Sequence, residues 1–579
     1  MRPPRTLTTV SRTETEPEWI LRKPDESAVE AIVERLDCHP VLARALVNRG
    51  IEDPETARRF LEPTLADCHD PADLPDVKPA LRRLARALHG DERVVIHGDR
   101  DVDGVAGTAI LREVFRSGGL SVHTTIPGKW DGYGLDVETI EELAAMDTDL
   151  LVTVDCGTTA VGPIDRADEL GIDVIVTDHH EPEPPPPEPL ALINPRRADA
   201  DYPNPSLAGA GVAYKLAQVF GDGVGLEPET VADSGLALAG LATMADYVPL
   251  TVENRALARA GFERLQGGDR PGLTAAMDRQ GVETIRDVTW SLVPLLNGSK
   301  EDPDGDLLLE LFATRDRDRA EAILDRFEDF RAERKAERAE QLAHLEACLD
   351  GALGGQLDAD APVIWVEVER YVGGVPLSRV AERYGRPVVA LRHDDGVVKA
   401  SARGAGSVDL VGAFARHGER LETFWGHPGA AGFRVRRDRL EVVRRAITDE
   451  IAERYDPAEL RPTVEIDAAV EPAAVDADLV TGLQALYPCG TDNPEPTVLV
   501  SGLEVERLER FGSEDEHVRL VPAADDAVGA VHWGGAGAVS ALTPPVVLDL
   551  VGTLVLDDWG GSPDPMVSVE DWQVAEDPT

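Results

Sequence analysis

Three short runs of valine and isoleucine, each followed by acidic residues or histidines, constrain the fold more than any other feature of the sequence. The runs and the residues after them are Val94–Ile96 with His97 to Asp103, Val152–Val154 with Asp155, and Val174–Val176 with Asp178, His179 and His180. Helix-like stretches separate the runs, at roughly 105–118 and 160–171. Strands that alternate with helices predict a parallel sheet with crossover helices. We therefore expect the polar residues to meet at the carboxyl edge of that sheet, where ligands bind in such folds.

The first polar cluster reads His97-Gly-Asp99-Arg-Asp101-Val-Asp103-Gly104. Carboxylates this close together repel one another unless a cation lies between them. The spacing is also that of a calcium-binding EF-hand loop, but the twelfth position counted from Asp99 is Ile110 rather than Glu, and a strand precedes the loop. For this cluster alone an acidic surface turn remains an alternative, and the two further clusters argue against it.

A fourth acidic position, Asp246, ends an Ala- and Leu-rich helical stretch that begins near Gly240. Carboxylate oxygens and neutral imidazole suit Mn²⁺ and Mg²⁺, whereas the cysteines show no spacing typical of a zinc site. The residues therefore favour a hard divalent cation.

These four positions, His97 to Gly104, Asp155, Asp178-His179-His180 and Asp246, resemble in order and spacing the four motifs of the DHH phosphoesterase superfamily. Other segments are similar to those of one family within it, the RecJ single-stranded-DNA exonucleases: Arg49-Gly-Ile, Phe60 to Pro63, Gly132-Tyr-Gly134, Asn194-Pro195, Leu207 to Lys215, Glu253-Asn254-Arg255 and Tyr487 to Pro496. The resemblance covers roughly residues 18–575.

The resemblance implies a metal-dependent exonuclease that degrades single-stranded DNA from the 5′ end, in recombination, repair or replication. It implies two divalent metal ions, with Mn²⁺ preferred and Mg²⁺ the alternative. In such sites a carboxylate bridges two ions about 3.5–4 Å apart. On the family pattern the bridge is Asp155, and the other ligands are Asp101, Asp103, His179 and Asp246, with either His97 or Asp99 completing the shell of the first ion. His180 is expected to contact the phosphate, and Asp178 is expected to orient the histidine pair.

The expected fold class is α/β, in five parts. They are an N-terminal helical arm (1–75), a parallel-sheet DHH catalytic domain (76–315), a long connecting helix (316–350), a DHH-associated α/β domain (351–458) and a C-terminal OB-like β domain (459–579). The helix is expected because residues 316–349 are rich in Arg, Glu, Ala and Leu and contain neither Gly nor Pro. By resemblance, the DHH-associated domain closes over the metal site and grips substrate through Ser401, Arg403, Gly426 and His427.

The C-terminal part contains four short segments that are typical of strands, at 497–500, 518–521, 528–532 and 546–555. OB folds bind single strands through grooves and stacked aromatic rings. The aromatic candidates are Phe511, Trp533 and Trp559. A place in the core is the alternative for each, and we expect it for at least one.

The composition indicates an unusual environment, because the chain has 58 basic and 107 acidic residues, which give a formal charge of -49. Such a balance ordinarily argues against nucleic-acid binding, which relies on Lys and Arg. The acids are spread over every predicted domain, however, which is typical of a halophilic, salt-filled cytoplasm. Strong salt weakens counterion release, so stacking, metal coordination and short-range phosphate contacts would carry binding. Five dispersed cysteines and the lack of a long apolar stretch predict a cytoplasmic protein without a membrane span.

Some positions depart from the family pattern. Arg100 replaces an aromatic residue, Trp425 replaces a glycine, Gly404 replaces a serine, and Asn297-Gly-Ser-Lys300 replaces a segment that carries a DNA-contacting arginine. Two alternative functions therefore stay open. One is a nuclease acting on RNA or short oligonucleotides, and the other is a catalytically weak or inactive scaffold of a replication complex. Single-stranded nucleic acid, with DNA preferred, is the expected partner, and replication or repair proteins are possible further partners.

Overall fold

The computed structural model describes residues 17–575 apart from residue 133 and residues 354–360, 457–459, 461, 525–526, 541 and 558–563. The chain divides into two compact units. Unit 1 comprises Pro24–Arg331 and Thr481–Glu495, and unit 2 comprises the described residues of Arg2–Lys23, Ala332–Val480 and Pro496–Thr579. We call Thr481–Glu495 the late segment, because it joins unit 1 from far along the sequence.

The centre of unit 1 is a five-stranded sheet in which every neighbouring pair is parallel. Its strand order is β3 (Val122–Thr125), β2 (Val94–Gly98), β4 (Leu150–Val154), β5 (Asp173–Thr177) and β6 (Ala191–Ile193). The central strands are short, apolar and buried along their length, as is usual for parallel sheets covered on both faces. The predicted parallel sheet with crossover helices is thereby confirmed.

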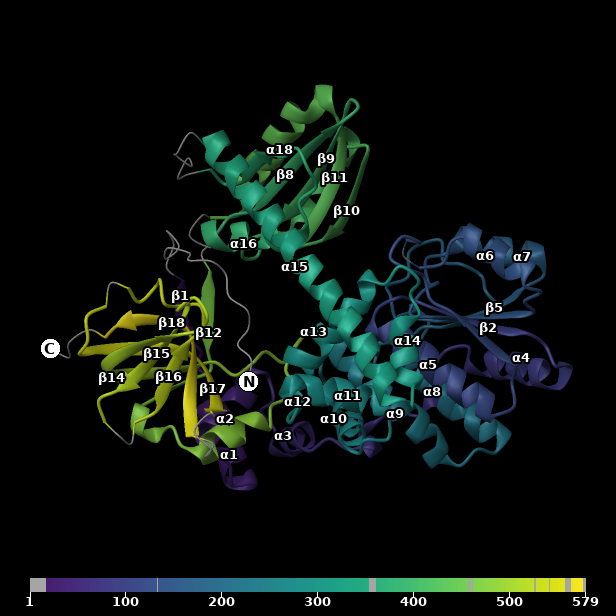
Figure 1. Ribbon diagram of the computed structural model, residues 1–579, viewed down its shortest axis with the longest axis horizontal. Coiled ribbons are helices and arrows are strands. Elements are labelled where there is room, and N and C mark those ends of the chain that lie inside the picture. The colour runs from purple at the N-terminus through teal and green to yellow at the C-terminus, as the bar shows by residue number, and fades with distance from the viewer. Residues whose placement is uncertain are drawn as a thin grey trace. The chain divides into compact units, whose positions relative to one another are not determined.

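Alternate residues of these strands pack into separate cores on the two faces of the sheet. Ile96 and Val152 belong to the larger core, and their neighbours Val95 and Leu151 belong to the smaller one. The larger core is covered by α4 (Val77–Gly90), α5 (Val102–Ser117), α8 (Gly209–Val224), α9 (Pro228–Ala245) and α10 (Val252–Gln266). The smaller core is covered by α6 (Val137–Ala145) and α7 (Val161–Leu170), on the other side of the sheet in Figure 1.

Unit 1 is completed by short helices before and after this layered centre. Those before it are α1 (Glu26–Leu36), α2 (Pro40–Asn48), α3 (Pro54–Leu61) and the 3-10 turns η1 (Leu65–Asp67) and η2 (Pro71–Asp73). Those after it are α11 (Pro271–Gln280), α12 (Ile285–Asp287), the π-helical turn η3 (Val288–Leu292), α13 (Val293–Leu296), η4 (Asn297–Glu301) and α14 (Leu307–Ala313).

The fully buried side chain of Arg255, on α10, joins three distant segments of unit 1. Its guanidinium donates to the carbonyl of Phe60 at the end of α3, at 2.6 Å. It also donates to three carbonyls of the late segment, those of Ala485 (2.7 Å), Tyr487 (3.0 Å) and Pro488 (3.1 Å). Burial lowers the pKa of Arg255 to about 9. These carbonyl oxygens carry partial negative charge and stabilise the buried cation. The same hydrogen bonds fix the late segment to α10.

The long helix α15 (Arg317–Leu353) contains 37 residues, so it spans about 55 Å at about 1.5 Å per residue. Ile323, Leu324 and Phe327 belong to the core of unit 1. Leu345 and Leu349 belong to a core of unit 2. The helix predicted at 316–350 is therefore present, and its two ends take part in different cores.

Unit 2 contains a five-stranded mixed sheet, flanked by helices, that corresponds to the expected second α/β part. Its strand order is β10 (Thr423–His427), β11 (Ala430–Arg436), β9 (Val397–Arg403), β8 (Val388–Asp394) and β7 (Ile364–Glu367). The accompanying helices are α16 (Gly374–Tyr384), α17 (Leu410–Arg416), the 3-10 turns η5 (Gly418–Arg420) and η6 (Arg437–Arg439), and α18 (Leu440–Arg454). Two apolar cores form on this sheet, one with α17 and α18 and one with α15 and α16.

Unit 2 also contains a closed β-barrel, because β14 pairs with both β15 and β17. The pairing runs from β14 (Val498–Phe511) through β15 (His517–Pro522), β16 (Gly529–His532), β18 (Asp564–Val574) and β17 (Val546–Asp557) back to β14. Unit 2 also contains β13 (Ala468–Val470), η7 (Pro472–Ala474) and the parallel pair β1 (Glu18–Leu21) and β12 (Thr463–Ile466). The helix α19 (Ala477–Gln484) begins in unit 2 and ends in the late segment. The predicted C-terminal β part is confirmed, and β12, β13 and β18 are strands beyond the four predicted segments.

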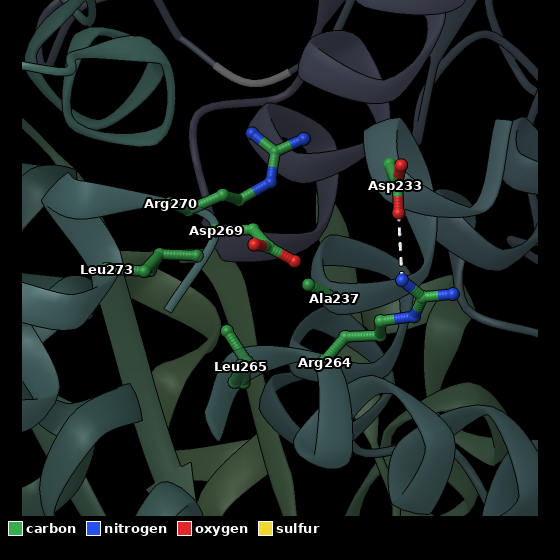
Figure 2. Close-up of a pocket in the computed structure, with 7 residues that line it drawn as sticks. All are labelled: Asp233, Ala237, Arg264, Leu265, Asp269, Arg270 and Leu273. Carbon is green, nitrogen blue, oxygen red and sulfur yellow. Dashed lines mark hydrogen bonds and ion pairs between the residues drawn. The ribbon is translucent and has the colours of Figure 1, made fainter. Parts of the chain in front are cut away.

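A small pocket lies among α9, α10 and α11 of unit 1, and Figure 2 draws the side chains that line it. Its volume of about 10 Å³ leaves room for about one water molecule. Beside it, the Arg264 guanidinium donates to Asp233 at 2.8 Å. The pocket is lined by residues other than the predicted site residues, and it is too small for a nucleotide.

All five cysteines are free thiols. Among the helices in the described part of the chain, none combines the length and the apolar character that crossing a membrane requires.

Candidate metal centre

The first polar cluster forms the turn between β2 and α5. Asp101 is the N-cap of α5, and its Oδ1 accepts from the backbone N–H groups of Asp103 (3.0 Å) and Gly104 (3.1 Å). This capping begins the helix directly after the strand and fixes the acids at the carboxyl edge of the sheet. Gly104 needs to be glycine here, because a Cβ atom would lie 2.4 Å from the carbonyl oxygen of Asp99.

Asp155 follows β4, the central strand, and its backbone is left-handed with φ 60°. Aspartate tolerates this conformation better than most residues. The N–H of Asp155 donates to the carbonyl of Thr177 at 2.9 Å, so it still pairs with β5. Its buried carboxylate is thereby held at the middle of the sheet edge.

Asp178, His179 and His180 follow β5, and the buried carboxylate of Asp178 organises the turn. Its Oδ1 accepts from the backbone N–H of His179 (2.7 Å) and from Nδ1 of His180 (2.8 Å). Its Oδ2 accepts from the N–H of Thr158 at 2.9 Å. The structure therefore gives Asp178 the contacts expected of a residue that orients both histidines.

Asp246 is the C-cap of α9, and it reaches the same place from the helical layer. His179 lies at the centre of the assembled group. Its Nε2 lies 3.1 Å from Asp155 Oδ1, 3.5 Å from Asp246 Oδ2 and 3.7 Å from Asp103 Oδ2. Carboxylates from three other segments, far apart in the sequence, thus converge on this histidine.

Seven of the predicted residues carry potential ligand atoms in three overlapping groups, and the atoms of each group lie within 4.8 Å of one another. The groups are Asp99 with Asp101 and Asp155, Asp103 with His179 and Asp246, and Asp155 with His179 and His180. Asp155 and His179 each belong to two groups.

His97 lies outside these groups, and its ring nitrogens have other partners. Nδ1 lies 2.9 Å from the hydroxyl of Thr125, and Nε2 lies 3.3 Å from the carbonyl of Gly134. Burial lowers the pKa of His97, which keeps the ring neutral. Of the two candidates for completing the first metal shell, His97 and Asp99, the geometry favours Asp99.

The carboxylate of Asp103 also joins the cluster to the start of α8. Its two oxygens accept from the backbone N–H groups of Gly209 and Ala210, each at 2.7 Å. A helix N-terminus favours negative charge, which partly offsets the cost of burying this carboxylate. The approach is tight, because a Cβ atom on Gly209 would lie 2.7 Å from the Cβ atom of Asp155.

The electrostatics of the cluster call for a cation. Burial, and then repulsion by neighbouring carboxylates, raises the pKa of Asp103 and of Asp155 well above the usual range. Burial, followed by the charge of Asp101, raises the pKa of Asp99 to about 6. A divalent cation would reverse these shifts, because it favours the ionised carboxylates.

Unpaired atoms point to the same chemistry. Asp99 Oδ1, Asp155 Oδ1 and Asp246 Oδ2 are buried and accept no hydrogen bond from the described residues. Buried oxygens without donors are rare unless an ion or water satisfies them. Two of these oxygens, those of Asp155 and Asp246, lie beside the imidazole of His179. Such a set fits Mn²⁺ or Mg²⁺, which prefer oxygen ligands and accept imidazole.

His180 has the opposite electrostatic character to the buried acids. Its hydrogen bond to Asp178 raises the pKa of His180 to about 9. Burial alone would raise the pKa of Asp178, but the hydrogen bond and charge of His180 lower it to about 2. More than half of the His180 side chain is exposed, so this cation faces the solvent at the rim of the site.

Two residues at the site were not predicted to have a positive role there. Lys300 Nζ lies 3.3 Å from Asp101 Oδ2, so the departure from the family segment leaves a cation beside the cluster. Arg100 donates to the carbonyls of Gly128 (3.2 Å) and Lys129 (2.7 Å), so it holds the loop after β3. Neither role follows from a sequence pattern, because each depends on a partner far away in the sequence.

The four predicted substrate-binding residues of unit 2 lie on two strands of its mixed sheet. Ser401 and Arg403 are on β9, Gly426 and His427 are on β10, and both strands pair with β11. Ala430 pairs with both Arg403 and His427, so these two lie at the same end of the sheet. Burial lowers the pKa of Arg403.

The predicted aromatic residues of the barrel pack against one another. The ring centroids of Phe511 and Trp533 lie 5.5 Å apart, and both rings pack against a small core that contains Val555 and Met566. The core role that we expected for at least one of them thus agrees with their packing. Trp559 lies outside the described residues.

Two family models match parts of the chain. Residues 93–243 match the DHH family, N-terminal domain, and residues 466–571 match the RecJ OB domain. The first contains three of the four predicted motifs, and the second contains the barrel.

Similar proteins cover most of the chain. It is 29% identical over 570 residues to the single-stranded-DNA-specific exonuclease RecJ of Bacillus subtilis (strain 168), covering 96% of this chain and 71% of that protein. It is 31% identical over 491 residues to the protein of the same name from Dickeya dadantii (strain 3937), covering 80% of this chain and 83% of that one.

Among solved structures, the fold resembles that of RecJ in complex with Mn²⁺ from Thermus thermophilus. The TM-score is 0.77 at 27% identity, covering 97% of this chain and 80% of that one. A second structure, RecJ in complex with Mg²⁺ from the same organism, gives a TM-score of 0.72 at 25% identity, covering 97% of this chain and 79% of that one.

Proposed function

The chain belongs to the RecJ family, and from that membership we propose that it is a metal-dependent exonuclease that hydrolyses phosphodiester bonds of single-stranded DNA from the 5′ end. The observation that carries this proposal is the convergence of carboxylates and His179 into three overlapping groups of ligand atoms at one edge of the sheet. Several of these oxygens are buried without hydrogen-bond donors, which suits a site built for cations.

Two divalent ions, with Mn²⁺ preferred and Mg²⁺ the alternative, fit this set of side chains. Asp155 is the proposed bridge, because it takes part in two groups and its carboxylate has two oxygens, whereas the neutral imidazole of His179 offers one lone pair. The proposed remaining ligands are Asp99, Asp101, Asp103, His179 and Asp246. When bound, such a pair of ions polarises the scissile phosphate and lowers the pKa of an attacking water.

The protein's own cations are proposed to bind and orient the phosphate. Asp178 holds the His180 ring through Nδ1, which leaves the charged ring at the exposed rim of the site. There it donates to a phosphate oxygen and stabilises the charge that grows in the transition state. Lys300 adds a second positive charge beside Asp101.

The remaining elements are proposed to bind the parts of the DNA strand that lie further from the reacting bond. In unit 2, Ser401, Arg403, Gly426 and His427 are proposed to bind the substrate backbone, and the barrel is proposed to bind single-stranded DNA. We place the protein in the cytoplasm, which is supported by its five free thiols. Replication or repair proteins are proposed further partners.

The test is digestion of end-labelled single-stranded DNA and RNA with Mn²⁺ in high KCl, comparing the wild type with Asp155→Ala. We expect the wild type to release the 5′ label as short products from DNA, and Asp155→Ala to release none. Release of a 3′ label first would refute the polarity, and preferred cleavage of RNA would refute the substrate. Equal inertness of both proteins would refute the exonuclease and favour a scaffold.

A further inference from the structure

We infer that Tyr247 is a stacking platform for an unpaired base of the strand at the metal centre. Tyr247 directly follows the proposed ligand Asp246, and the residue is 91% exposed. This inference rests on the proposed function, because it assigns a binding role for a nucleic-acid strand. It adds a contact to the base, where the metal centre, His180 and Lys300 contact only the phosphate.

The loop that carries Tyr247 is anchored on both sides. On the near side, the N–H of Val248 donates to the carbonyl of Asp246 at 2.7 Å. On the far side, the side-chain amide of Asn254 donates to the carbonyl of Pro249 at 2.8 Å. The N–H of Leu250 donates to the carbonyl of Thr491, in the late segment, at 3.1 Å. Val248 and Leu250 are buried. The ring is therefore exposed from a fixed loop, and little ordering entropy is lost when a base stacks on it.

The position of Tyr247 puts its ring within reach of a bound nucleotide. Consecutive Cα atoms are about 3.8 Å apart, so the tyrosine starts next to Asp246. Asp246 Oδ2 in turn lies 3.5 Å from Nε2 of His179, inside the cluster that would hold the phosphate. A nucleotide with its phosphate at the cluster therefore brings its sugar and base close to this loop.

The ring of Tyr247 is open on both faces, unlike the other large exposed aromatic rings of unit 1. Lys129 Nζ lies 4.8 Å from the ring centroid of Trp130. Trp290 donates to Glu495 at 3.0 Å and lies beneath the guanidinium of Arg286. Within the described part of the chain, Tyr247 has neither a ring contact nor a hydrogen-bond partner.

Stacking suits a protein with a formal charge of -49. Attraction between Lys or Arg and phosphate weakens as salt rises, whereas base–aromatic stacking does not depend on charge and contributes about 1–3 kcal/mol per base. Every base has a face that can stack on an aromatic ring, so binding through Tyr247 is independent of the DNA sequence. It requires an unpaired base, however, and so it favours single strands over duplex ends.

The test crosses the variants Tyr247→Ala and Tyr247→Phe with two kinds of oligonucleotide, one intact and one with a single abasic position among the first three nucleotides. For intact DNA, we expect Tyr247→Ala to raise KM by about tenfold or more, with kcat within about twofold, and Tyr247→Phe to match the wild type. For one of the abasic oligonucleotides, the wild type should show a KM about tenfold or more above its KM for intact DNA. For Tyr247→Ala, the KM should be the same with that abasic oligonucleotide as with intact DNA. Equal KM values for the wild type and Tyr247→Ala, or equal abasic penalties in both, would overturn the inference.

A binding measurement separates this inference from the exonuclease activity. Anisotropy of a fluorescent single strand, with Ca²⁺ in place of Mn²⁺, reports Kd without cleavage. We expect the same pattern of Kd ratios even if the wild type cleaves nothing, in which case the exonuclease proposal fails and the stacking role stands. Unchanged Kd in Tyr247→Ala would refute the stacking role whether or not the protein cleaves DNA. The metal content of Tyr247→Ala should equal that of the wild type.

Discussion

Asp155 and Asp246 both reach the cluster around His179, but they take part in different numbers of ligand groups. Asp155 belongs to two groups and Asp246 to one. Replacing a shared ligand therefore removes a contact to both proposed ions, whereas replacing a terminal ligand affects one. This difference makes the bridging assignment testable.

We predict that Asp155→Asn loses both bound Mn²⁺ ions and that Asp246→Asn keeps one of them. Loss of both ions should lower kcat by about a thousandfold or more, since metal ions supply several kcal/mol of transition-state stabilisation. Metal content measured by mass spectrometry after equilibration with Mn²⁺ checks the stoichiometry. Asp165→Asn is a matched control, because Asp165 is exposed on α7. Full occupancy in Asp155→Asn would contradict the bridge.

A second residue-scale prediction concerns the proton on His180. The hydrogen bond to Asp178 raises the pKa of His180 to about 9, above its ordinary value of 6.5. The stability gained from this pair is therefore fully present below about pH 6.5 and is lost as the pH rises through about 9. NMR titration of the metal-free protein should show one histidine with this pKa, and Asp178→Asn should return it toward 6.5. A histidine that titrates near its ordinary value in both proteins would contradict the pairing.

At the scale of elements, the start of α8 packs directly against the metal cluster. We predict that Gly209→Ala weakens Mn²⁺ binding by about 10–100-fold, a loss typical of changes that displace a ligand without removing it. The new Cβ atom would lie 2.7 Å from the Cβ atom of Asp155, so one of the two must move. Titration calorimetry with Mn²⁺ measures the change in affinity.

Gly211→Ala, two residues along the same helix, is the matched control for this prediction. Its Cβ atom would lie 3.6 Å from the nearest side-chain atom, which is an ordinary contact. Metal affinity should stay within about twofold of wild type, and the free energy of unfolding should rise by up to about 1 kcal/mol, because alanine favours a helix over glycine. Equal losses of affinity in the two variants would show that the close approach of Gly209 to Asp155 is unimportant.

The elements that the sequence predicted well are those whose pattern is local. The strands of the parallel sheet are apolar runs, and the site residues stand directly after them in the sequence. Both could therefore be identified from short stretches of sequence. In the barrel, β14 (Val498–Phe511) extends well past the predicted 497–500. Its second half, Val505 to Phe511, was missed because two charged residues separate successive apolar ones, so the stretch lacks the strict alternation that indicates a strand. The positions of Lys300, Arg100 and Tyr247 were not predicted, since each depends on how distant segments meet.

At the scale of the whole molecule, the charge of -49 sets how stability responds to salt. We predict that the melting temperature rises from about 0.1 M to about 1 M KCl, because the Debye length falls from about 10 Å to about 3 Å and repulsion among the acids is screened. Circular dichroism measures the transition. Sucrose at the same osmolality should raise the melting temperature less, and an equal rise in sucrose would contradict the screening argument.

The bonds of Arg255 also determine when the catalytic unit can be finished. Its carbonyl partners at Ala485, Tyr487 and Pro488 come 230 or more residues after it in the chain. Proteins are synthesised from the amino end, and their domains begin to fold in that order. A ribosome must therefore translate the chain as far as Pro488 before all of these hydrogen bonds can form. The growing chain remains an incomplete nuclease until the late segment emerges, when most of the second unit has already been made.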